Sequence, residues 1–97
     1  MKDYIKSRLF ERDMLVEYVS KTKALEIMQT QIAELEKNID ALDEDIEELE
    51  DSGLNRTVEI LCKTRNSLNL ERLELEIHIC KLRLWIAEFE KARQLAR

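Results

Sequence analysis

Apolar side chains recur every three or four residues along two stretches of the chain, one on each side of Gly53. The first stretch runs over four heptads without a slip: Leu25, Met28, Ile32, Leu35, Ile39, Leu42, Ile46 and Leu49. In the second stretch an apolar position recurs every seven residues: Leu54, Leu61, Leu68, Leu75, Leu82, Phe89 and Ala96. Spacing of this kind and length predicts two coiled-coil helices.

A single turn separates the two patterns. Gly53 is the only glycine, the chain has no proline, and a glycine after a serine suits the left-handed end of a helix. The sequence therefore predicts a long helix over 2–51, a turn over 52–55 and a second long helix over 56–96.

Folding the chain about this turn brings the two apolar patterns into register. Ile46 then meets Leu61 and Ile39 meets Leu68, so an a position faces a d position, as in antiparallel coiled coils. The predicted fold is all-α, an antiparallel coiled-coil hairpin that forms one domain over 1–97. The residues from Leu54 onward that recur every seven positions are the d positions of the second helix, and its matching a positions are Val58, Arg65, Arg72, Ile79, Ile86 and Arg93. Two of these arginines fall opposite leucines of the first helix (Arg65 opposite Leu42, Arg72 opposite Leu35).

Each predicted helix also carries apolar residues outside this seam. On the second helix they form a stripe whose centre lies about 150° from the seam, so one partner helix cannot cover both faces. The two sets are expected to mediate self-association: Ile5, Leu9, Val16 and Val19 on the first helix, and Leu70, Leu73, Ile77 and Leu84 on the second.

Two arrangements would bring these sets together. If the chain bends near 20–23, residues 2–20 fold back and make a three-helix bundle. If it runs straight, the same segment reaches a second molecule and the product is a swapped homodimer, a homodimeric helical bundle. No glycine or proline lies at 20–23 to force a bend. The sequence therefore favours the homodimer.

Charge is distributed unevenly along the chain. The net charge is −5 over 97 residues, which argues against direct nucleic-acid binding. Within 34–51 there are ten acidic residues and one basic residue, Lys37. Such a segment either solubilises the helix or docks on a larger protein with a basic surface. The candidate docking residues are Asp40, Asp43, Glu44, Glu47, Glu48, Glu50 and Asp51.

No constellation of residues points to catalysis, a cofactor or a metal. The single histidine, His78, and Cys80 project about 200° apart on a helix, which does not suit a shared metal ion. Cys62 and Cys80 are too far apart on one helix to form a disulfide with each other, which leaves reduced thiols or a bridge between molecules. Without a membrane-spanning stretch or a signal peptide, the expected location is the cytoplasm.

These features predict a non-enzymatic protein–protein interaction module, a small acidic adaptor or modulator. In size and composition the chain resembles the compact, acidic helical proteins with which bacteriophages redirect host nucleases and recombination enzymes. That resemblance implies a phage-type modulator. The alternatives are a structural coiled-coil spacer or assembly protein, and a weak nucleic-acid binder that uses the basic end of the hairpin.

Overall fold

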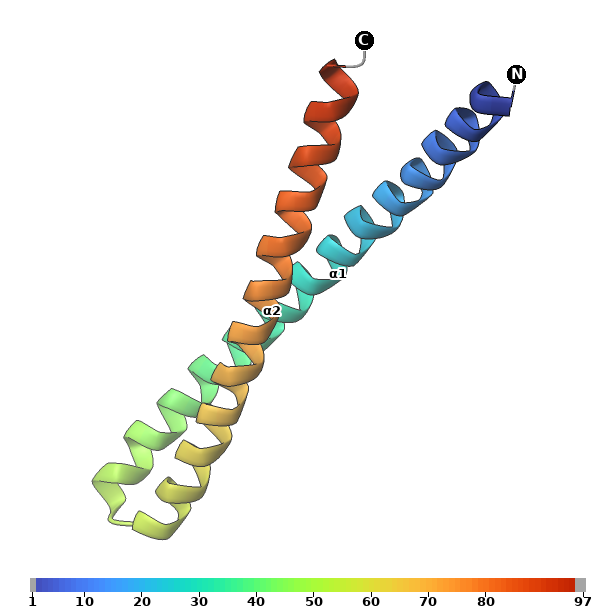
Figure 1. Cartoon of the computed structure of the whole chain (residues 1–97). Coiled ribbons are helices and arrows are strands. Elements are labelled where there is room, and N and C mark those ends of the chain that lie inside the picture. Colours follow the sequence, from blue (N-terminus) through green and yellow to red (C-terminus); the bar gives the residue numbers. More distant parts are fainter. Residues whose placement is uncertain (1, 96–97) are drawn as a thin grey trace.

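The computed structural model describes the backbone of residues 2–95 and the side chains of residues 11–95. Two helices account for nearly all of it: α1 (Lys2–Ser52) and α2 (Asn55–Leu95). They run in opposite directions and form an extended hairpin (Figure 1). The predicted all-α hairpin is therefore confirmed. The end of the predicted second helix, residue 96, lies outside the described residues.

The turn is shorter than the predicted segment 52–55, since only Gly53 and Leu54 lie outside the helices. Gly53 adopts φ +78°, a left-handed conformation that costs residues with a Cβ atom about 1–2 kcal/mol. The amide of Gly53 donates to the carbonyl of Glu50, and the Ser52 hydroxyl donates to the carbonyl of Leu49 at 2.8 Å. These bonds satisfy carbonyls that the end of α1 would otherwise leave without a donor.

The core is a single seam between the two helices. Ile39, Ile46 and Ile79 are its buried side chains among those described, and most of the other seam residues are half-buried, whereas Leu54 beside the turn is 53% exposed. The register follows the one that the heptads predict. Arg65 lies beside Asp43, next to its predicted partner Leu42, with Nη1 3.2 Å from Oδ1.

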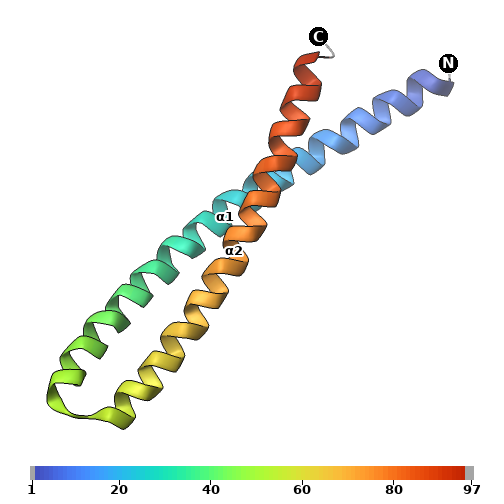
Figure 2. The same cartoon turned by 60° about the vertical axis from the view of Figure 1, so that its left-hand side comes forward.

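The two helices separate toward the open end of the hairpin. Figures 1 and 2 both show the N-terminal part of α1 diverging from the C-terminal part of α2. The sequence supplies a reason, because beyond Met14 the seam positions of α1 are Glu11 and Ser7. Without an apolar side chain there, little holds α1 against α2.

The first helix is continuous through residues 20–23, so the chain does not fold back into a third helix over the described range. The molecule is correspondingly long, with extents of 76 × 20 × 14 Å. Neither described helix contains a stretch apolar enough to cross a membrane.

Candidate functional site

The candidate docking residues gather at the closed end of the hairpin. All seven of them are exposed, and we call them the acidic tip: Asp40, Asp43, Glu44, Glu47, Glu48, Glu50 and Asp51. They occupy the last turns of α1, which lead directly into the turn at Gly53 (Figure 1). The hairpin thus presents its negative charge at one extremity of an elongated molecule.

Basic side chains neutralise little of this charge. Within the described side chains, the one ion pair that a tip residue makes joins Asp43 to Arg65. Lys63, which lies near the tip on α2, is instead paired with Glu59 at 3.6 Å. Most of the tip carboxylates therefore remain open to a ligand.

The tip also lies at an electrostatically unfavourable place. The last turn of α1 has no basic residue and contains Glu50 and Asp51. The C-terminal end of a helix carries a partial negative charge, so each exposed acid there costs a few tenths of a kcal/mol. Glu50 and Asp51 therefore lower the stability of the hairpin slightly.

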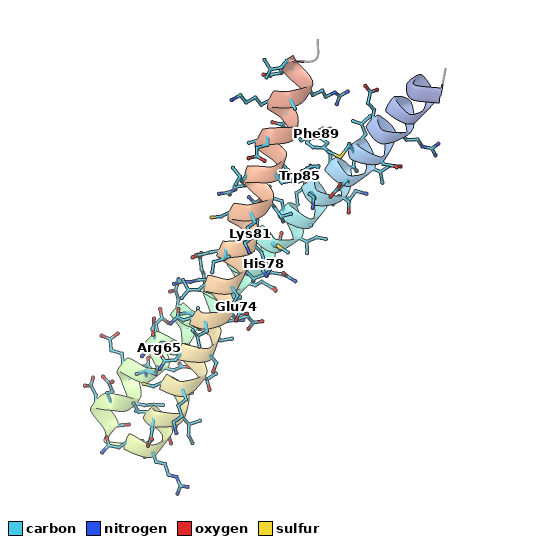
Figure 3. The ribbon with its side chains drawn as sticks, in the orientation of Figure 1. Arg65, Glu74, His78, Lys81, Trp85 and Phe89 are labelled. Atoms are coloured by element: carbon cyan, nitrogen blue, oxygen red, sulfur yellow. The ribbon has the colours of Figure 1, made fainter. Side chains whose placement is uncertain are left out.

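A shallow open groove of about 450 Å³ crosses the middle of the hairpin. His78, Glu74 and Glu71 line it from α2, and Glu34 lines it from α1. Among the described residues, no three histidine, cysteine or acidic side chains are placed to hold a metal ion. His78 lines this groove, whereas Cys80 lies on a different face of α2 (Figure 3 labels His78). The heptad pattern gave no sign of the groove.

Aromatic side chains join the two helices near the open end. The Tyr18 and Phe89 rings stack with centroids 4.9 Å apart, and those of Phe89 and Trp85 stack at 5.4 Å. The Lys21 ammonium lies 5.0 Å from the Trp85 ring centroid, a cation–π arrangement. Trp85 and Phe89 are half-buried and face α1 (Figure 3), so they fill the seam where it ends.

A hydrogen bond ties this cluster to α2. The Tyr18 hydroxyl donates to Glu90 Oε1 at 2.7 Å, and this bond raises the pKa of Tyr18 above its ordinary value because ionisation would remove the donor. Because the pKa of Tyr18 is raised in the folded state, the contact stabilises the hairpin at pH values below the pKa of tyrosine in the unfolded chain, which is about 10. That stabilisation is lost as pH rises through the folded pKa.

Titration of a single tyrosine tests this contact. In Tyr4→Phe, Tyr18 is the one tyrosine left, and its ultraviolet absorbance should report ionisation at a higher pH than a free tyrosine shows. Adding Glu90→Gln should move the transition back toward the free value, because the charged acceptor is gone. Identical transitions in the two proteins would show that the bond is not formed in solution.

The two sets of self-association candidates are not brought together within one chain. Leu70, Leu73, Ile77 and Leu84 are 47–64% exposed on α2. Val16 and Val19, on the diverging part of α1, are 65% and 52% exposed. The side chains of Ile5 and Leu9 lie outside those described.

No protein-family model matches the chain, and no curated protein or solved structure shows significant similarity to it.

Proposed function

We propose that this hairpin is a protein–protein interaction module, and that its acidic tip docks on a basic surface of a larger protein and alters that protein's activity. The observation that supports this most is the position of the tip. Its carboxylates are exposed and mostly unpaired, and two of them, Glu50 and Asp51, lie in the last turn of α1, where negative charge destabilises the fold. A cluster that served only solubility could lie anywhere on the outer faces of the two helices.

The proposed contact is electrostatic, so salt should act on folding and on binding in opposite directions. Screening weakens the repulsion among the tip carboxylates and stabilises the hairpin, whereas it weakens attraction to a basic partner and slows association. A cytoplasmic setting suits this role, because the described chain has free thiols at Cys62 and Cys80.

The experiment compares two triple charge reversals. The tip variant replaces Glu44, Glu47 and Glu48 by lysine and spares Asp43, which Arg65 already engages. The control variant makes the same change in charge at Glu11, Asp13 and Glu26, which are also exposed and lie on the same helix. Proteins captured by the wild-type chain are identified, and the affinity of the purified partner is then measured for all three forms.

We expect the tip variant to lose at least about tenfold in affinity, the equivalent of about 1.4 kcal/mol, and the control variant to keep most of it. Circular dichroism should show the same helix content in all three. Equal affinity of the tip variant and the wild type would overturn the docking role. Equal losses in both variants would mean that net charge, not the tip, governs the interaction.

A further inference from the structure

The side of α2 turned away from α1 carries an uncovered apolar stripe. Its members are spaced three and four residues apart, and we call them the rear stripe: Leu70, Leu73, Ile77, Cys80, Leu84 and Ala87. All six are exposed, with Leu70 and Leu84 at 64% and 62%. Such spacing over about 26 Å of helix is that of a coiled-coil seam. The described part of the chain places nothing on this seam (Figures 1 and 2).

The charged residues that border the rear stripe alternate in sign. One edge carries Glu74, Lys81 and Glu88 at seven-residue intervals, and Figure 3 labels the first two. The opposite edge carries Glu76 and Arg83, also seven residues apart. An edge that alternates in this way is complementary to a copy of itself that runs in the opposite direction.

The geometry points to a second copy of the chain as the occupant, with the two α2 helices packed antiparallel along their rear stripes. In this register Ile77 faces Cys80 of the second copy and Leu73 faces Leu84, so a positions again meet d positions. Glu74 then lies beside Lys81 of the second copy. Glu76, which the single chain leaves 3.8 Å from Arg72, lies beside Arg83 of the second copy. The two-fold axis passes between Ile77 and Cys80.

The acidic tip decides between this arrangement and a parallel one. Parallel packing would also set opposite charges together along the edges. However, it would place both tips at the same end of the dimer, and each segment 34–51 carries a net charge of −9, from ten acids and one lysine. Antiparallel packing sends the tips to opposite ends, each at the level of Lys91 and Arg93 of the second copy along the helix axes.

The native cysteines test this register directly. Near the two-fold axis, the Cys80 thiols of two copies come within about 10 Å, whereas their Cys62 thiols are about 50 Å apart along the helices. A short bis-maleimide should therefore link Cys62→Ser into dimers and leave Cys80→Ser unlinked. In a background without either native cysteine, Ala87→Cys should stay unlinked, because antiparallel packing holds these positions about 25 Å apart. Linkage at position 87 would overturn the antiparallel register.

The mass in solution, measured by light scattering, completes the test. The wild type should have the mass of two chains, and Leu84→Glu should have the mass of one with unchanged helix content. The matched control is Ile60→Glu, because Ile60 is 58% exposed but lies off the rear stripe, and it should stay dimeric. A monomeric wild type would overturn the proposal. The proposal would also be overturned by a dimer that Val16→Glu disrupts and that the bis-maleimide does not cross-link through Cys80. Such a result would mean that the N-terminal part of α1 covers the rear stripe.

Discussion

Ile46→Ala is expected to lower the free energy of unfolding by about 2–4 kcal/mol. Ile46 is the most buried described side chain, at 4% exposure, and its predicted partner across the seam is Leu61. The seam has no second layer of side chains from which to fill the space that the truncation leaves. Urea denaturation followed by circular dichroism at one protein concentration measures the change.

The control for this truncation is the same substitution on an uncovered face. Ile60 is 58% exposed, so Ile60→Ala should change the free energy of unfolding by no more than about 0.5 kcal/mol. The better helix propensity of alanine offsets part of the lost apolar contact there. If the two truncations cost the same, the seam would not be the core of the hairpin.

Arg72→Leu is expected to raise the free energy of unfolding by about 1–2 kcal/mol. Arg72 occupies an a position of the seam with its side chain about one-third exposed. Its Nε atom is buried and makes no hydrogen bond among the described atoms, and Glu76 Oε1 lies 3.8 Å away. A leucine would remove the unsatisfied donor and add an apolar contact opposite Leu35. Thermal and urea denaturation should both show the gain.

Arg65→Leu provides the comparison, because Arg65 occupies the equivalent a position one heptad earlier. Its guanidinium donates to Asp43 across the hairpin at 3.2 Å, so the substitution loses a contact as well as gaining one. It should therefore be closer to neutral than Arg72→Leu. A destabilising Arg72→Leu would mean that this arginine is satisfied in solution.

The fold was predictable because it depends mainly on one feature of the sequence, the heptad spacing of apolar residues. The unbroken heptads fix which face of each helix is apolar, and one residue able to take a left-handed conformation, Gly53, fixes where the chain reverses. Once the turn is placed, the register follows, and the Asp43–Arg65 pair lies where the alignment of Arg65 with Leu42 put it. The exposure of the acidic tip followed from the same helical periodicity.

Other features depend on side-chain geometry that periodicity does not encode. The heptads place both Arg65 and Arg72 in the seam, but they do not say that one reaches a carboxylate across the hairpin while the other leaves Nε unbonded. The Tyr18–Glu90 hydrogen bond likewise depends on where the aromatic rings stack. The groove lined by His78 arises from two helices together, so no single-helix pattern reveals it.

The slenderness of the hairpin affects how its mass should be determined. Its radius of gyration is 21.6 Å, whereas a compact domain of 97 residues has a radius of about 12.5 Å. A rod-like particle of 11.6 kDa diffuses slowly and leaves a gel-filtration column early, at the volume expected of a much heavier sphere. Elution volume alone would therefore overestimate the number of chains in the particle.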